Sequence, residues 1–303
     1  MKGDDSNVIP FLYIWENSKP TNMRKFIILL VVALSCLVPE VMDARTDRII
    51  KVLSIGNSFS EDAVEQHLHD LAKAEGTQII IGNLYIGGCS LERHLKNAQE
   101  NLPHYNYRKI GLDGKKFETR GVTLAAGLAD EQWDYISFQQ QSGRSGIYET
   151  WEESLPALIE YVKVRVPKKA TFALHQTWAY DPTSDHRDFK NYGNDQARMY
   201  KAIVDAVERT ARLTGVKLVI PCGTAIQNAR TTDLKGTLTR DGYHLHKTYG
   251  RYIAACTWYE KVCRKSVVGN PYRPQKMTAD QQRLAQKSAH AAVRRSKKVT
   301  KIK

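Results

Sequence analysis

The residue types of a Ser-His-Asp acyl-transfer site occur in this sequence at positions far apart along the chain. Ser58 follows the apolar run "KVLSI" and a Gly-Asn pair, and Asp241 and His244 stand three residues apart in "DGYHLH". Serine is a weak nucleophile until an imidazole accepts its proton, and a carboxylate must hold the tautomer of that imidazole. On a turn, Asp241 can bond Nδ1 of His244 and leave Nε2 for Ser58. The sequence therefore predicts a Ser58–His244–Asp241 triad.

Acyl transfer also needs hydrogen-bond donors for the oxyanion of the tetrahedral intermediate. The backbone N–H of Ser58 is one candidate, because the chain turns helical immediately after it. Gly88, in the "GGCS" segment, is the second candidate, since a residue without Cβ lets the backbone approach a substrate closely.

Strand-like and helix-like segments alternate along the chain and predict how these residues are positioned. Five interleaved strands favour an α/β fold, a three-layer α/β/α sandwich around a mainly parallel five-stranded sheet. The expected strands cover 49–55, 77–88, 133–141, 170–178 and 216–221, and the expected helices cover 61–75, 90–99, 149–166, 195–213 and 247–262. Between the second helix and the third strand, two alternating runs flank Asp113-Gly114, which predicts an inserted β-hairpin.

Ligands of such sheets bind at the loops that follow the carboxyl ends of the strands. Those loops hold Ser58, the Gly87-Gly88 pair, the "QQQS" segment at 139–142 and the Asp241–His244 turn. A serine, glycines, amides and an Asp-x-x-His at one edge are the groups that acyl transfer requires.

These segments resemble the SGNH (GDSL-like) hydrolase superfamily and, within it, the DUF4886-type family of exported Bacteroidetes proteins. The resemblance rests on "GNSFSEDA", "GGCSLERHL", "WDYISFQQQS", "HQTWAY" and "TRDGYHL", and it covers about residues 48–263. It implies Ser58 as nucleophile, Gly88 as an oxyanion donor, His244 as base and Asp241 as its partner. It further implies an exported serine esterase that deacetylates a carbohydrate or polyol ester, with no cofactor and no nucleic-acid partner.

One loop departs from the superfamily pattern, in which an asparagine after the third strand supplies a further oxyanion donor. Here that loop carries glutamines, so Gln141 or Gln140 is expected to serve, with Gln140 also a candidate for substrate binding. Asn194 is interpreted as a helix cap. His175 and Trp178 end a central strand at the same edge, and either line the substrate pocket or belong to the core.

Three alternatives remain open at this point. Ser58 with Glu61 fits a capping box, which needs no chemistry. The missing asparagine is compatible with a non-catalytic carbohydrate-binding protein on the same fold. Asp241, His244 and His246 also resemble part of a metal site, although the other histidines are scattered and no metal is expected.

The charge of the chain is concentrated at its C-terminal end. Of the formal net charge of +13, residues 264–303 carry twelve Lys and Arg against one acid, Asp280, hence +11. The remainder is close to neutral, which does not favour nucleic-acid binding. We therefore predict a hydrolase-like domain over 45–265 and a basic, solvated helical or disordered extension over 266–303.

The N-terminal part predicts export. A cationic Arg24-Lys25 pair and the apolar run 26–38 fit a signal peptide over 23–44, and residues 1–22 would be a non-native extension ahead of it. The mature protein would be periplasmic or extracellular, or anchored to a membrane if Cys36 is lipidated. The other four cysteines show no dense disulfide framework and are expected to be buried thiols.

Overall fold

The computed structural model describes residues 48–236 and 238–303. The predicted signal peptide and Cys36 lie outside the described residues. Within them, no helix has the length and apolar character that crossing a membrane requires. Cys89, Cys222, Cys256 and Cys263 are free thiols, three of them buried, as expected.

A single seven-stranded sheet forms the centre of the domain, in the order β4-β3-β2-β1-β5-β6-β7. Five strands are parallel and confirm the predicted α/β fold: β1 (Ile50–Gly56), β2 (Ile79–Tyr85), β5 (Tyr135–Phe138), β6 (Thr171–His175) and β7 (Leu218–Ile220). The predicted hairpin, β3 (Tyr105–Ile110) and β4 (Lys116–Val122), joins the sheet antiparallel beside β2. The insertion therefore extends the sheet.

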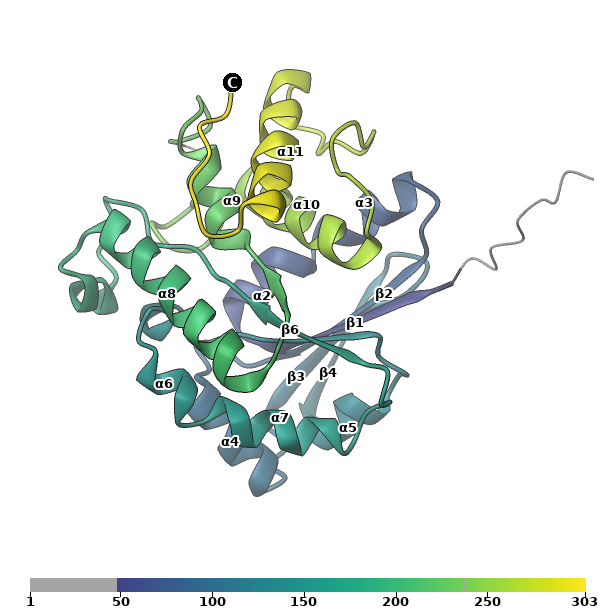
Figure 1. Ribbon diagram of the computed structural model, residues 1–303. Coiled ribbons are helices and arrows are strands. Elements are labelled where there is room, and N and C mark those ends of the chain that lie inside the picture. Colours follow the sequence, from purple (N-terminus) through teal and green to yellow (C-terminus); the bar gives the residue numbers. More distant parts are fainter. Residues whose placement is uncertain (1–47, 237) are drawn as a thin grey trace, which may run out of the picture. The chain divides into compact units, whose positions relative to one another are not determined.

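Helices cover both faces of the sheet (Figure 1). One layer contains α2 (Ser58–Val64), α3 (Leu68–Ala74), α9 (Cys222–Ala229), α10 (Gly250–Cys263) and α11 (Ala279–Arg294). The other contains α4 (Leu91–Gln99), α5 (Leu124–Ala129), α6 (Glu149–Glu152), α7 (Leu155–Lys163) and α8 (Gln196–Thr214). Two short 3₁₀ helices, η1 (Ser142–Arg144) and η2 (Arg187–Tyr192), precede α6 and α8.

The helix predicted over 61–75 begins earlier and is divided into α2 and α3. His67 lies at the break, where its Nδ1 pairs with the Tyr272 hydroxyl at 2.9 Å and its Nε2 with the Lys247 carbonyl at 2.8 Å. These partners lie about two hundred residues away along the chain. The apolar periodicity continues through the break, so the sequence pattern alone could not show it.

The C-terminal extension departs from the prediction of a solvated end. Helix α11 packs against α9 and α10 and buries Ala285, Ala289 and Ala292. Beyond α11, Thr300 N–H donates to Asn228 Oδ1 at 2.7 Å and Ile302 N–H donates to Thr231 Oγ1 at 3.0 Å. The small alanine side chains allow close helix packing, and the compact unit spans Arg48–Lys303.

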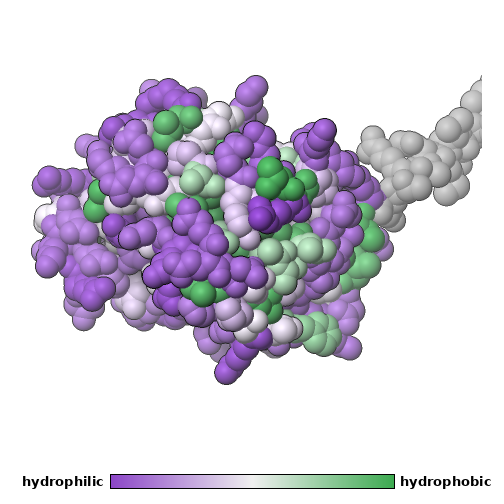
Figure 2. Space-filling model, turned by 90° about the horizontal axis from the view of Figure 1, so that it is seen from below, coloured by the Kyte–Doolittle hydropathy of each residue, from purple (hydrophilic) through white to green (hydrophobic). Residues whose placement is uncertain are grey.

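Hydrophilic residues cover most of the face seen from below in Figure 2, and apolar residues occur in groups among them. Large exposed apolar side chains, such as Phe117 and Val164, are scattered over different elements. Isolated apolar residues of this kind are normal at the surface of globular proteins.

Candidate active site

The order of the parallel strands locates the edge at which a ligand would bind. After β1 the chain enters α2 on one face of the sheet, and after β5 it enters η1 and α6 on the other face (Figure 1). Neighbouring strands whose connections diverge in this way leave a crevice at their carboxyl ends. Ser58 follows β1 and Gln139–Gln141 follow β5, so both loops lie at this point.

Ser58 is the first residue of α2, and its hydroxyl is not used as a helix cap. The cap is Asn57, whose Oδ1 accepts the Phe59 N–H at 3.0 Å. Glu61 pairs with Arg108 and Arg251, so the capping box considered for Ser58 and Glu61 does not form. Ser58 is partly exposed, and among the described residues its hydroxyl has no hydrogen-bond partner. Its side chain is therefore available to a substrate.

Gly56 explains how the first turn of α2 can follow β1 so closely. A Cβ at this position would lie 2.5 Å from Ser60 Oγ. Ser60 is itself fixed, because its hydroxyl bonds the Asn57 carbonyl at 2.7 Å and Asn83 Oδ1 at 2.9 Å. The glycine thus lets the serine-bearing turn pack directly on the end of the strand.

Asp241 and His244 form the predicted pair. His244 Nδ1 lies 2.7 Å from Asp241 Oδ2, and the His244 N–H donates to Asp241 Oδ1 at 2.7 Å. A carboxylate only accepts hydrogen bonds, so it holds the proton on Nδ1 and leaves Nε2 as an acceptor. Burial tends to raise the pKa of Asp241, but the hydrogen bonds from His244 and Tyr243 outweigh it and hold that pKa below its usual value.

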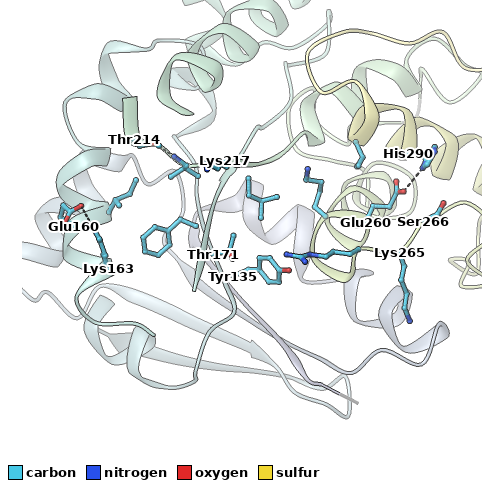
Figure 3. A pocket seen from close by; sticks show the side chains of 18 residues that line it. Tyr135, Glu160, Lys163, Thr171, Thr214, Lys217, Glu260, Lys265, Ser266 and His290 are labelled. Atoms are coloured by element: carbon cyan, nitrogen blue, oxygen red, sulfur yellow. Dashed lines mark hydrogen bonds and ion pairs between the residues drawn. The ribbon is translucent and has the colours of Figure 1, made fainter. Parts of the chain in front are cut away.

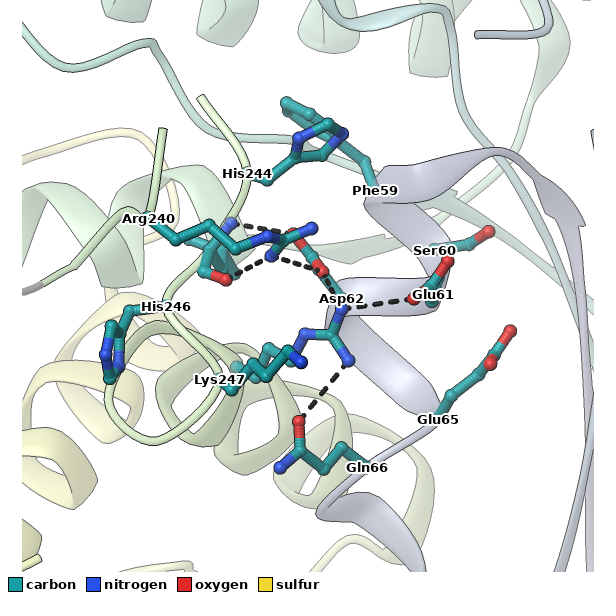
Figure 4. Close-up of polar contacts among 12 residues, drawn as sticks. Phe59, Ser60, Glu61, Asp62, Glu65, Gln66, Arg240, His244, His246 and Lys247 are labelled. Carbon is teal, nitrogen blue, oxygen red and sulfur yellow. Dashed lines mark hydrogen bonds and ion pairs between the residues drawn. The ribbon is translucent and has the colours of Figure 1, made fainter. Parts of the chain in front are cut away.

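Two contacts bring the Asp241–His244 turn to the start of α2. The ring of Phe59, next to Ser58, meets the His244 ring edge to face, with centroids 6.0 Å apart. Leu245 N–H donates to Asp62 Oδ2 at 2.7 Å. Figure 4 shows His244 beside Phe59 above the first turn of α2. In this part of the described chain, no hydrogen bond joins the Ser58 hydroxyl to His244.

Asp62 is a positioning residue that the sequence analysis did not identify. Its side chain is 0% exposed and lies between Arg240, 3.1 Å from its Oδ1, and Arg251, 2.6 Å from its Oδ1. Figure 4 shows this network below His244, with Arg240 reaching back from the same turn. Charge-assisted hydrogen bonds to the buried Asp62 therefore hold the Asp241–His244 turn against α2. In the helix expected over 61–75, Asp62 lies away from the face formed by Val64, Leu68 and Leu71, so the apolar periodicity gave no signal for its burial.

The Gly88 loop lies against the Ser58 loop, because Asn57 Nδ2 donates to the Cys89 carbonyl at 3.0 Å. Gly88 is exposed and adopts φ +60°, and a Cβ there would meet nothing within 4 Å. The glycine is required by its backbone conformation and not by crowding. Among the described residues, the N–H groups of Gly88 and Ser58 have no hydrogen-bond partner, which leaves two donors on neighbouring loops.

The three glutamines after β5 have different surroundings. Gln139 is buried and links two loops, since its Nε2 donates to Asn57 Oδ1 at 2.7 Å and its Oε1 lies 2.6 Å from His175 Nδ1. Gln140 is also buried, and its amide bonds the Leu91 N–H and the Thr150 carbonyl. Gln141 is partly exposed and donates to Asp188 Oδ2 at 3.2 Å. The Gln140 amide is thus occupied by hydrogen bonds within the protein, and of the three glutamines only Gln141 is partly exposed.

His175 and Trp178 lie in the core, which is one of the two alternatives left open by the sequence. Both are 0% exposed. Trp178 stacks on Phe59 with centroids 4.2 Å apart and donates to the Tyr243 carbonyl at 2.7 Å. His175 and Trp178 therefore pack beneath the residues of the candidate site, and neither side chain is accessible to a ligand.

Asp241, His244 and His246, the residues considered for a metal site, do not point toward one common position. The His246 ring stacks on Tyr249, and its Nδ1 accepts the Thr248 N–H at 3.2 Å. In Figure 4 it lies on the far side of Arg240 from His244. No group of three or more His, Cys, Asp or Glu suited to a metal ion occurs in the part of the chain that the structure describes. Asn194 does not cap α8, because Asp195 does so.

Comparison with known proteins places the chain in a family. Residues 51–292 match the family described as "Domain of unknown function (DUF4886)". The chain belongs to the DUF4886 family. A crystal structure of a DUF4886 family protein from Bacteroides uniformis shares 53% identity and superposes with a TM-score of 0.83, over 84% of this chain and 98% of that one. The search of curated proteins found no match.

A more distant solved structure shares the α/β fold of this chain. A protein from Slackia heliotrinireducens, named "a putative SGNH hydrolase", is 21% identical with a TM-score of 0.50, over 71% of this chain and 99% of that one. An acetylxylan esterase from Geobacillus stearothermophilus is 14% identical with a TM-score of 0.45, over 75% of this chain and 97% of that one. At 21% identity the likeness to the Slackia heliotrinireducens protein concerns the fold alone, and at a TM-score of 0.45 nothing further follows from the esterase.

Proposed function

We propose that this DUF4886 protein is an exported serine esterase that removes an acyl group, such as acetyl, from a carbohydrate or polyol. The observation that carries the proposal is the 2.7 Å contact between Asp241 and His244 Nδ1, with the His244 ring against Phe59, the residue after the partly exposed Ser58. The SGNH fold supports the reaction class, while the carbohydrate and the export are proposed from the family resemblance and the sequence of residues 23–44.

The proposed reaction uses only groups of this chain. The Ser58 hydroxyl attacks the ester carbonyl while Nε2 of His244 takes its proton, and Asp241 stabilises the imidazolium. The oxyanion accepts hydrogen bonds from the N–H groups of Ser58 and Gly88. The intermediate collapses as His244 protonates the departing alcohol. Water, activated by the same imidazole, then releases the acid and restores the serine.

Hydrolysis of p-nitrophenyl acetate tests the proposal. We expect turnover by the chain from residue 45, and loss of that turnover in Ser58→Ala. Ser90→Ala is the matched control, because Ser90 is a partly exposed serine whose hydroxyl accepts the Arg93 N–H as the cap of α4. Equal rates for the parent protein and Ser58→Ala would contradict the proposal.

A non-catalytic carbohydrate-binding protein is the second candidate. Two observations favour it: the Ser58 hydroxyl is not bonded to His244 among the described residues, and the amide of Gln141 is engaged by Asp188. Catalytic hydrogen bonds are often long before substrate binds, so the first observation does not exclude catalysis. Absence of turnover together with binding of an acetylated oligosaccharide would identify this second function.

A further inference from the structure

A cavity of about 900 Å³ opens at the amino-terminal ends of the parallel strands, whereas Ser58 lies at their carboxyl ends. Tyr135, Thr171 and Leu218, the first residues of β5, β6 and β7, line it, whereas Ser58 follows the last residue of β1. Figure 3 shows these strand ends facing side chains of α10 and α11. Its volume falls within the range of ligand pockets, about 300–1,000 Å³. A ligand here would not touch the proposed triad.

The cavity contains positive charge that the protein does not neutralise. Lys217, Lys261 and Arg264 line it, and none of the three forms an ion pair with another described residue. Burial lowers the pKa of Lys261, although the nearby Glu260 acts in the opposite direction. Cations gathered in a concave, partly buried site favour an anionic ligand.

The same cavity also holds a hydrogen-bond acceptor without a donor. The Glu260 side chain is 7% exposed, and its Oε1 lies 2.8 Å from His290 Nδ1. Its Oε2 is buried and has no partner among the described residues. Leaving such an atom unpaired costs free energy, so a ligand that donates a hydrogen bond here gains affinity. A simple anion brings no donor, but a hydroxyl group does.

The shape and the remaining lining suit a chain of rings. Tyr135 and Phe172 are partly exposed aromatic residues that line the cavity. A second hollow of about 520 Å³ shares four lining residues with the first and so lies next to it: Val216, Lys217, Lys261 and Val293. In the second hollow Arg212 and Lys297 both pair with Glu208, so among the described residues the unpaired cations are those of the first cavity.

We propose that this edge binds an acidic oligosaccharide, one built from uronic acids. Its carboxylates would pair with Lys261 and Arg264, its hydroxyls would donate to Glu260, and its rings would lie on Tyr135 and Phe172. The site would hold an acidic glycan at a distance from the triad. This inference does not depend on the proposed esterase activity.

Calorimetric binding to the Ser58→Ala protein tests the proposal, because hydrolysis cannot then disturb the measurement. The probes are trigalacturonate, neutral β-1,4-galactotriose and citrate. We expect trigalacturonate to bind at least tenfold more tightly than either of the others. Citrate carries negative charge without sugar rings, and galactotriose carries rings without charge, so together they separate the two contributions.

Two variants assign the binding to this cavity. Glu260→Gln keeps an acceptor for His290 but replaces the free acceptor with a donor, and Arg264→Asn removes a cation at a residue with φ +56°, which asparagine tolerates. Each should weaken trigalacturonate binding by about tenfold or more, the value of a hydrogen bond to a charged group. Lys115→Gln, at the exposed hairpin turn, removes the same charge elsewhere and should change nothing.

Three results would overturn the proposal: no binding of trigalacturonate, equal binding of citrate or galactotriose, or unchanged binding in Arg264→Asn. Arg264 is exposed at the end of α10, so its substitution tests the site even if Glu260→Gln proves unstable. Failure here leaves the p-nitrophenyl acetate result unaffected, so the two proposals are judged separately.

Discussion

The charged groups at the two ends of the parallel strands differ in how they are paired. At the carboxyl edge Asp241 is bonded to His244, Asp62 lies between two arginines, and Asn57 is bonded by Gln139. At the amino edge Lys261 and Arg264 have no ion pair among the described residues and Glu260 Oε2 has no donor. The charged side chains proposed for catalysis are held in place by hydrogen bonds and ion pairs with one another. Those proposed for binding have no such partner and would form their hydrogen bonds and ion pairs with the ligand.

Removing the imidazole of His244 should lower the rate of ester hydrolysis more than any other substitution. A small loss of rate would mean that the paired groups at the carboxyl ends of the strands are not a catalytic site. If His244 is the base, we expect His244→Gln to lower kcat by a factor on the order of 10⁶, as for the base of known serine hydrolases. The measurement is the rate of p-nitrophenyl acetate hydrolysis. His246→Gln is the matched control, since that ring stacks on Tyr249 outside the site, and it should retain the rate. A comparable loss in both variants would revive the metal interpretation.

Asp241→Asn should give the next largest effect. The carboxamide can present its NH₂ group to Nδ1 and so stabilise the wrong tautomer of His244, with a loss of kcat on the order of 10⁴. Steady-state rates measure the loss, and circular dichroism checks that the fold is intact. A rate within threefold of the parent protein would mean that Asp241 is not the partner of the base.

Asp62→Asn tests whether the turn is held to α2 by charge. Removing one partner of a buried ion pair leaves uncompensated charge, so unfolding should become easier by about 3–5 kcal/mol in urea titrations. Glu92→Gln is the control, because its pair with Arg144 is exposed and should be worth no more than about 1 kcal/mol. Equal destabilisation of the two variants would remove the assigned role of Asp62.

Gly88→Ala should have the smallest effect of the four. The new methyl group meets no atom within 4 Å, so the cost is the positive φ alone, about 1–2 kcal/mol. Thermal unfolding measures it against Gly236→Ala, where a Cβ also meets nothing and φ is not in the left-handed region. An unchanged stability in Gly88→Ala would show that this backbone conformation does not constrain the loop.

The sequence predicted what depends on local pattern. Alternating strands and helices indicated the fold, Asp113-Gly114 indicated the hairpin, and the three-residue spacing of Asp241 and His244 indicated their pairing. Each of these signals lies within a short stretch of chain, where periodicity or spacing restricts the geometry.

The sequence could not predict contacts between distant side chains. Asp62 meets Arg251 across 189 positions, and α11 meets α9 and α10 only after the chain has folded around the sheet. Asn57, which caps α2, is itself bonded by Gln139 from the loop after β5. Many distant partners fit the same pattern, so tertiary packing decides which one is used.

Labelling with a serine-directed phosphonate tests the central claim most directly, namely that His244 and Asp241 activate Ser58. Mass spectrometry should locate the phosphonate on Ser58, and labelling should slow by orders of magnitude in His244→Gln while His246→Gln behaves like the parent protein. Labelling of another serine, or labelling of Ser58 at the same rate without His244, would contradict the account.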